Sequence, residues 1–189
     1  MHVADIDGTL TGRLLVATPP LVDPNFDRTV VLMLEHGEDG AIGVVLNRPS
    51  DTPIDDVLPE WRSLAAPPSA VFVGGPVSPD AVIALGRAPS DRPGEGFSPI
   101  LGDLGTVDVG RDPLDLGVPL EELRVFAGYA GWAPGQLEDE LAQHAWFVVD
   151  LEGDEPFAAA PEQLWRTVLR RQKGEIAVFA HYPEDVTSN

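Results

Sequence analysis

The sequence predicts a single-domain α+β protein with a mostly antiparallel sheet. Short apolar runs typical of strands outnumber the segments with helical periodicity, and turn sequences rather than helices join most of these runs. The length of 189 residues corresponds to one domain. The regular alternation of strand and helix that a doubly wound sheet needs is missing from the sequence.

Strands dominate the first half of the chain. We expect them at residues 14–17, 29–34, 41–46 and 71–73. The Asp39-Gly40 step predicts a tight hairpin between the second and third strands. Thr52, followed by Pro53 and then by two acidic residues, is typical of a helix start, so we predict a short helix over residues 52–58.

The second half adds two clear helices. We predict a helix over 134–142 and another over 161–172, which ends in Arg170, Arg171 and Lys173 with Gly174 as its cap. These basic residues complement the helix dipole, so the residues favour a structural role over an anion site. Residues 86–99, rich in Pro, Gly, Ser and Asp, are expected to form an exposed loop. Further strands are predicted at residues 81–85, 104–109, 123–126, 146–149 and 176–179.

Charge is the strongest global property. Thirty-one acidic residues stand against twelve basic ones, for a net charge of −19, and Lys173 is the only lysine. A surface of this kind repels phosphate backbones, because affinity for DNA comes largely from Lys and Arg. Direct nucleic-acid binding is therefore disfavoured, and the plain consequence of the charge is solubility.

Cysteine and targeting signals are missing from the sequence. Without cysteine, the chain has no disulfides, no thiol catalysis and no thiolate metal site. No apolar run follows a basic segment at the N-terminus, and none approaches the length of a membrane span. We therefore expect a cytoplasmic protein with no membrane contact.

Asp5-Ile6-Asp7-Gly8-Thr9 matches the first motif of haloacid dehalogenase phosphatases. In that chemistry both aspartates follow a buried parallel strand, and a lysine and further acids lie downstream. Only four residues precede this motif, and Lys173 falls at a predicted helix end. We interpret the match as a chance one in an acidic tail.

Three blocks together resemble a known family. They are LLVATPPLVDPNFDRTVV with GAIGVVLNRP over residues 12–49, VFVGGPV over 71–77, and FAGYAGWAPGQLEDEL over 126–141. Their order and spacing resemble the AlgH/YqgE family of bacterial proteins. The resemblance implies a bifurcated, mostly antiparallel β-sheet folded into a pseudo-barrel with a few flanking helices. It places one domain over residues 12–189. The N-terminal start departs from the family pattern, and we expect residues 1–11 to be a mobile extension.

Glycine-flanked aromatic residues make residues 128–138 the strongest candidate for a ligand site. Two glycines bracket Tyr129, and Trp132 precedes the helix that carries Gln136, whose N-terminal N–H groups can bind an anion. The alternative is a packed corner that seals the barrel, and the residues do not decide between the two. If a pocket forms, we expect it to be lined by Arg48, Gly74, Gly75, Tyr129, Trp132 and Gln136.

The other members of this predicted site also have two interpretations. Arg48 follows a strand, where it can bind a carboxylate or phosphate bidentately or pair with Asp51. Gly74 and Gly75 can present N–H groups to an anion or form a simple turn.

The sequence gives little support for metal binding or for hydrolase chemistry. The spacing of the four polar residues of the hairpin turn fits no common metal motif, so no metal or other cofactor is predicted; these residues are Glu35, His36, Glu38 and Asp39. Neither His144 nor His181 has a catalytic partner that the sequence reveals, and there is no Gly-x-Ser-x-Gly elbow.

The family resemblance implies no established catalytic residues, although some members are called transcriptional regulators. From the missing nucleophile and metal motifs and the net charge of −19, we expect a non-enzymatic regulatory or binding module that acts through a protein partner or a small ligand. The first alternative is an enzyme that acts on a small anionic substrate through Arg48 and the corner at residues 128–138. The second is a regulator that contacts DNA directly. The sequence does not indicate the oligomeric state.

Overall fold

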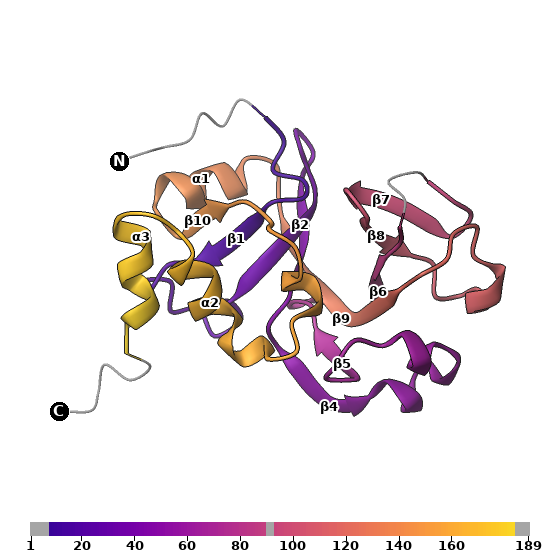
Figure 1. Ribbon diagram of the computed structural model, residues 1–189. Coiled ribbons are helices and arrows are strands. Elements are labelled where there is room, and N and C mark those ends of the chain that lie inside the picture. Colours follow the sequence, from indigo (N-terminus) through magenta and orange to yellow (C-terminus); the bar gives the residue numbers. More distant parts are fainter. Residues whose placement is uncertain (1–7, 90–92, 184–189) are drawn as a thin grey trace.

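The computed structural model describes residues 8–89 and 93–183, and its ten strands form one curled sheet, a half-barrel (Figure 1). The strand order is β10-β1-β2-β3-β9-β6-β8-β7, with β5 beside β9 and β4 beside β5. The strands are β1 (Leu14–Ala17), β2 (Val30–Gly37), β3 (Gly40–Val45), β4 (Pro49–Pro53), β5 (Ala70–Val73), β6 (Val77–Arg87), β7 (Phe97–Leu101), β8 (Leu104–Val107), β9 (Glu122–Trp132) and β10 (Trp146–Val149).

The sheet forks along one edge of β9. The C-terminal part of β9 pairs with β3, where Gly131 lies opposite Ile42, whereas Phe126 nearer its start pairs with Phe72 of β5. The β5–β9 pair is parallel, and the other strand pairs are antiparallel. We call β10, β1, β2 and β3 the first arm, and β6, β8 and β7 the second arm; the two arms share β9 (Figure 1).

The first arm is covered on both faces, which explains why all four residues of β1 are buried. Helix α2 (Leu164–Arg170) packs Trp165 and Val168 onto one face, where they meet Leu14 and Leu32. On the opposite face α1 (Gln136–Ala142) contributes Leu137. Strands that are buried on both faces have near-continuous apolar sequences. The apolar runs of β1 to β3 are the reason why these strands could be predicted from the sequence.

The second arm has its own apolar core, which includes Trp61, Phe97 and Leu123. The side chain of Arg87, at the end of β6, links the second arm to β9 and to the segment before α2. Its guanidinium pairs with Glu122 at 2.8 Å, Asp103 at 3.1 Å and Asp154 at 3.0 Å. Burial lowers the pKa of Arg87, but the hydrogen bonds to Glu122 and Asp103 outweigh that effect and raise it.

The α+β class, the antiparallel sheet and its folding into a half-barrel are confirmed. The predicted hairpin is also confirmed, because Gly37 pairs with Gly40 at the β2–β3 turn. The helix predicted over 134–142 corresponds to α1. The one predicted over 161–172 begins as a 3₁₀ turn at Pro161–Gln163 and continues as α2.

The predicted strand over residues 176–179 is wrong. The segment forms the short helix α3 (Glu175–Val178), and a 3₁₀ turn follows at Phe179–His181. Ile176 and Phe179, three residues apart, pack together against the core of the first arm, which is a helical spacing. Gly174, predicted to cap the preceding helix, instead begins α3 with a φ of 70°.

Two further predictions need correction. Residues 52–58 do not form an α-helix: Thr52 belongs to β4, and a 3₁₀ turn at Ile54–Asp56 follows, anchored by the buried Ile54. Nor is the predicted loop over 86–99 wholly exposed. Strand β6 runs through Arg87, and β7 begins at Phe97, which is buried in the second arm. Residues 90–92 of that loop lie outside the described residues.

The described part of the predicted extension packs onto the first arm. Leu10 is 3% exposed and joins the core beneath α1. The backbone N–H of Leu10 also donates to Nδ1 of His36 at 3.1 Å. The predicted mobility of residues 1–7, like most of the phosphatase-like motif, lies outside the described residues.

Candidate functional site

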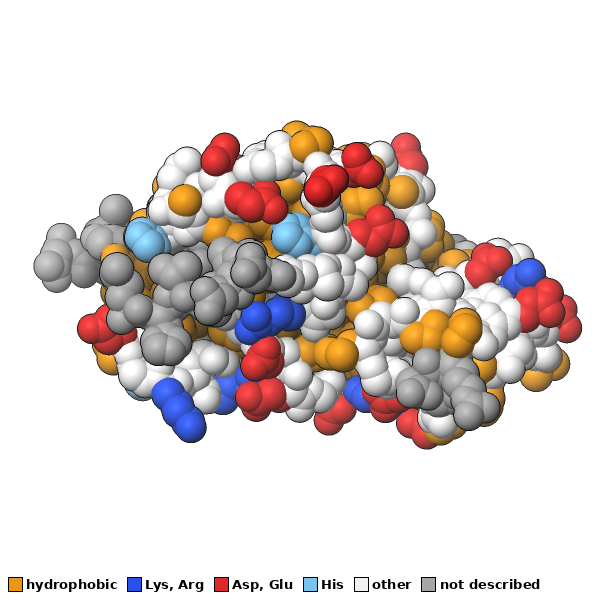
Figure 2. Space-filling model, turned by 90° about the horizontal axis from the view of Figure 1, so that it is seen from above, with side chains coloured by type: hydrophobic (Ala, Val, Ile, Leu, Met, Phe, Trp, Pro, Cys, Tyr) orange, Lys and Arg blue, Asp and Glu red, His pale blue; other side chains and the backbone are white. Residues whose placement is uncertain are grey.

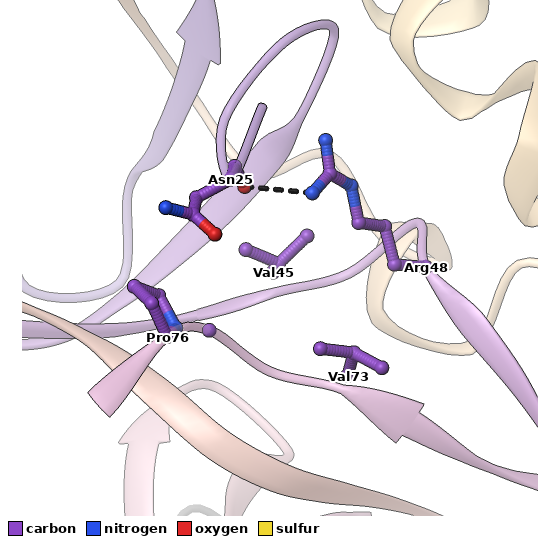
Figure 3. Close-up of a pocket in the computed structure, with 6 residues that line it drawn as sticks. Asn25, Val45, Arg48, Val73 and Pro76 are labelled. Atoms are coloured by element: carbon purple, nitrogen blue, oxygen red, sulfur yellow. Dashed lines mark hydrogen bonds between the residues drawn. The ribbon is translucent and has the colours of Figure 1, made fainter. Parts of the chain in front are cut away.

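Arg48 borders a small cavity at the fork of the sheet. The cavity measures about 60 Å³, which is room for a few water molecules rather than a metabolite. Figure 3 shows Val45 between Asn25 and Arg48, with Val73 and Pro76 on the other side of the cavity. Gly75 completes the lining.

The guanidinium of Arg48 is occupied by the backbone of the preceding loop. It donates to the carbonyls of Pro24 at 2.9 Å, Asn25 at 2.8 Å and Asp27 at 3.0 Å. Burial lowers the pKa of Arg48, although the charges of Asp27 and Asp23 oppose the shift. Arg48 thus fixes this loop, and the pairing with Asp51 considered from the sequence is not among its contacts within the described chain. Anion binding by Arg48 stays a prediction.

Gly74 and Gly75 occupy the fork itself. A Cβ on Gly75 would lie 2.2 Å from the carbonyl carbon of Tyr129, and one on Gly74 would lie 2.3 Å from the carbonyl oxygen of Gly128. The two backbones therefore approach too closely for any side chain. This close approach of the two backbones is a structural reason for glycine at both positions.

Trp132 and Gln136 lie in a packed cluster around Glu140. The carboxylate of Glu140 accepts hydrogen bonds from the indole of Trp132 at 2.9 Å, the indole of Trp146 at 2.8 Å and the amide of Gln136 at 3.0 Å. Trp132 is 6% exposed. The contacts support the packed-corner interpretation of residues 128–138.

Phe26 connects the two halves of the predicted site. Its ring lies 6.3 Å from that of Trp132 and 5.5 Å from that of Trp146, between centroids. It belongs to the loop whose carbonyls Arg48 binds. The structure thus brings Arg48, Gly74 and Gly75 together at the fork, whereas Trp132 and Gln136 form a separate cluster. The side chain of Tyr129 packs instead against the core shared with α2.

A second and larger cavity was not predicted from the sequence. It is a groove of about 420 Å³ between the two arms, which we call the inter-arm groove. Leu34, Glu35 and Ile42 of the β2–β3 hairpin form one wall. The other wall comes from β6, β7 and β8 and consists of Val82, Ile83, Ala84, Ser98, Pro99, Ile100, Thr106 and Val107.

Residues far apart in the sequence build this groove, so no local motif marks it. A Cβ on Gly12 would lie 3.3 Å from Cβ of Leu101, so the two arms also touch where the first strand begins. Seen from above, acidic side chains are spread over both arms and do not gather in one patch (Figure 2).

His36 also has a structural partner. The N–H of Leu10 donates to its Nδ1 at 3.1 Å, so Nδ1 carries no proton, and Nε2 donates to Glu138 at 2.8 Å. The hydrogen bond of the Glu138 carboxylate to its own backbone, and then that to His36, lower the pKa of Glu138. Within residues 8–89 and 93–183, no three His, Asp or Glu side chains gather as a metal site would require.

Arg124 is the buried charge that sequence reasoning missed. It is 2% exposed, and its guanidinium donates to the carbonyls of Ala66, Pro67, Pro156 and Ala158. It also lies 4.3 Å over the ring of Phe72. Burial lowers the pKa of Arg124 to about 10, although the charge of Glu122 opposes the shift. An arginine in a strand that is otherwise apolar was the only signal available.

Of the basic residues at the end of α2, Arg171 has a structural role. Arg171 pairs with Glu152 at 2.9 Å and Glu155 at 2.8 Å. This contact agrees with the structural role inferred from the sequence.

The fold and its cavities define a single-domain α+β protein with a forked half-barrel and a groove between the arms. The AlgH-like family model matches residues 14–177, and the chain therefore belongs to the AlgH-like family, whose molecular function is not established. This finding confirms the resemblance of the three sequence blocks.

Full-length relatives agree with that assignment. The UPF0301 protein SCO2948 of Streptomyces coelicolor is 50% identical, with 96% of each chain covered, and a UPF0301 protein of Streptomyces avermitilis is 51% identical over the same shares. The crystal structure of protein DIP2367 from Corynebacterium diphtheriae has a TM-score of 0.84 and 32% identity, covering 91% of this chain and 92% of that one. The solution structure of AlgH from Pseudomonas aeruginosa has a TM-score of 0.68 and 30% identity, covering 98% and 100%.

The helices in the described part of the chain are short. None of them has both the length and the apolar character that crossing a bilayer requires.

Proposed function

We propose that this protein is a non-enzymatic binding module whose ligand is a small, partly apolar molecule held in the inter-arm groove. The observation that carries this proposal is the size and lining of the groove. Its volume of about 420 Å³ falls within the range of small-molecule sites, roughly 300–1,000 Å³. The cavity at Arg48, at about 60 Å³, is too small for such a ligand.

The lining favours binding over catalysis. Most of its described residues are aliphatic, and its polar side chains are Glu35, Ser98 and Thr106. Histidine, the usual general base, and the cations that hold anionic substrates are not among these described lining residues. A site with apolar walls and a few polar groups is typical of ligand recognition.

A regulatory role follows from the position of the groove. A ligand in contact with Leu34 and Ile42 on one side and Ile83 and Ile100 on the other would bridge the two arms. Binding would then stabilise one arrangement of the arms, which is how a ligand shifts a conformational equilibrium.

The arginines argue against direct contact with DNA. Ion pairs with carboxylates occupy Arg13, Arg87, Arg111 and Arg171. Backbone carbonyls accept from Arg28, Arg48, Arg124 and Arg166. Few basic groups are left to displace the counterions of a phosphate backbone, in a protein of net charge −19.

The test is thermal unfolding against a panel of metabolites, with a variant that fills the groove. Ser98 is exposed and lines the groove, so Ser98→Trp places a large ring there without disturbing the core. Ser63→Trp, at an exposed position of the 3₁₀ turn at Pro59–Leu64 outside the groove, is the matched control. A ligand at about 100 times its dissociation constant adds roughly 2.7 kcal/mol to the stability.

We expect at least one metabolite to raise the midpoint in the wild type and in Ser63→Trp, but not in Ser98→Trp. The ligand should be recovered chemically unchanged. Equal stabilisation of both variants, or turnover of the ligand, would contradict the proposal.

A further inference from the structure

We propose that the ligand of the inter-arm groove is an amphipathic cation, a primary amine on an aliphatic body. This inference rests on the proposed function and adds the chemical class of the ligand to it. The ligand is a small molecule rather than a protein segment, because the groove has the volume of a small-molecule site.

The aliphatic part of such a ligand fits the walls. The first arm presents Leu34 and Ile42, and the second presents Val82, Ile83 and Ile100. Val82 is 48% exposed, so apolar surface in the groove is open to water. Covering it with methylene groups is favourable by about 25 cal/mol per Å² of apolar area removed from water.

The charge of the ligand follows from the single ionisable side chain in the described lining, the carboxylate of Glu35. Lysine, arginine and histidine are not found among these lining residues, so nothing there compensates a negative ligand. The net charge of −19 acts in the same direction, because it raises the local concentration of cations and lowers that of anions.

Two hydroxyl groups stand on the wall opposite Glu35. Ser98 and Thr106 pair directly across the β7–β8 ladder, and both line the groove. An ammonium group has three N–H donors and no acceptor, so it can donate to these hydroxyl oxygens and to the Glu35 carboxylate. A hydroxyl also donates and can therefore bind a ligand of either charge, so the preference for an amine over a carboxylate or a phosphate comes from Glu35.

The experiment compares three probes of equal chain length by isothermal titration calorimetry: n-octylamine, 1-octanol and octanoate. The apolar contribution is common to all three, so 1-octanol reports the groove alone and the other two report the charge preference. An exposed ion pair adds about 0.2–1 kcal/mol, so we expect n-octylamine to bind about threefold more tightly than 1-octanol. Octanoate should bind more weakly than both.

Two variants separate the site from the overall charge. Glu35→Gln removes the carboxylate of the groove, and Glu38→Gln removes an exposed carboxylate of the same hairpin outside it. Both change the net charge by one. We expect Glu35→Gln to abolish the preference for n-octylamine over 1-octanol and Glu38→Gln to retain it.

Failure of this inference is distinguishable from failure of the proposed function. If 1-octanol binds in a manner that Ser98→Trp blocks, but the amine shows no preference or the same preference in both glutamine variants, the groove binds ligands and the cationic class is wrong. If none of the three probes binds, the inference is overturned. If they bind equally to Ser98→Trp, the proposed function is overturned as well.

Discussion

Arg124 illustrates how a single residue holds separate segments together. Its guanidinium lies between the carbonyls of Ala66 and Pro67, which follow the 3₁₀ turn at Pro59–Leu64, and those of Pro156 and Ala158, and the described contacts include no carboxylate partner. A buried charge without a counter-ion is stable only if its hydrogen bonds are made. Arg124 therefore acts as a structural connector between the β4–β5 region and the segment that leads into α2.

Arg124→Met should lower the free energy of unfolding by about 3 kcal/mol, because several buried carbonyls would lose their donor. Urea unfolding at neutral pH measures this loss. Arg62→Met, at an exposed position of the neighbouring 3₁₀ turn, is the matched control and should change stability by less than about 0.5 kcal/mol. Equal, small losses in both variants would show that the buried guanidinium contributes little.

Glu138 should make the stability depend on pH in the acidic range. Its pKa is lowered in the folded state, so the folded protein binds fewer protons than the unfolded chain around pH ~4. The stabilisation is present above the unfolded pKa and is lost as the pH falls toward the folded pKa.

Glu138→Gln should therefore be less stable than the wild type at pH ~6, and the difference should shrink toward pH ~3. Urea unfolding at several pH values gives this comparison. Glu38→Gln, on the exposed turn, provides the reference. A difference that stays constant with pH would disprove a role for the ionised carboxylate.

At the scale of elements, the fork depends on the close approach of two backbones. Gly75 lies against Tyr129 so tightly that even a methyl group would overlap with main-chain atoms. Such atoms cannot move without breaking the pairing of β6 with β9.

Gly75→Ala should cost about 3 kcal/mol or prevent folding, because overpacking against backbone has no cheap relief. Gly37→Ala, where an added Cβ meets nothing within 4 Å, should be close to neutral. Thermal unfolding followed by circular dichroism measures both. A neutral Gly75→Ala would mean that the fork can open.

The elements also show what the sequence could predict. Strands buried on both faces, such as β1 and the first half of β2, are continuous apolar runs and were predicted close to their observed positions, whereas the end of β2 at residues 35–37 was not predicted. Residues 176–179 have the same apolar character, but Phe179 packs onto Phe147 at 5.5 Å between ring centroids, and that tertiary contact accompanies a helix. A short apolar run does not distinguish strand from buried helix until its partner is known.

The residues predicted to line one pocket are divided between two places in the structure, and none of them lines the inter-arm groove. Arg48 and Gly75 do border one cavity, because both lie next to strand ends that meet at the fork. Trp132 and Gln136 belong to another cluster, because Glu140 and Trp146 draw them into a packed corner. The inter-arm groove arises only when two distant hairpins face each other, and no local spacing encodes that.

For the whole molecule, the excess of acidic residues should limit stability at low ionic strength. Thirty-one acidic groups repel one another in the compact state, and salt screens this repulsion. Raising the salt concentration from about 0.01 to about 0.2 M should raise the melting temperature by a few degrees.

Because screening depends on ionic strength alone, NaCl and KCl should act equally in this experiment. Differential scanning calorimetry measures the midpoint in each salt. An increase with only one of the two cations would indicate a specific ion site instead, and no increase would contradict the repulsion.

The central claim is that ligands bind between the arms and not at the fork or the tryptophan corner. The most direct measurement is a titration of the ¹⁵N-labelled protein with n-octylamine, followed by amide chemical shifts. If ligands bind between the arms, the shifts should fall in both walls of the groove, at Leu34, Ile42, Ile83 and Ile100, with the Gly75 amide and the Trp132 indole unchanged. Shifts centred on Gly75 or on Trp132 and Gln136 would contradict it and would move the binding site to the fork or to the corner.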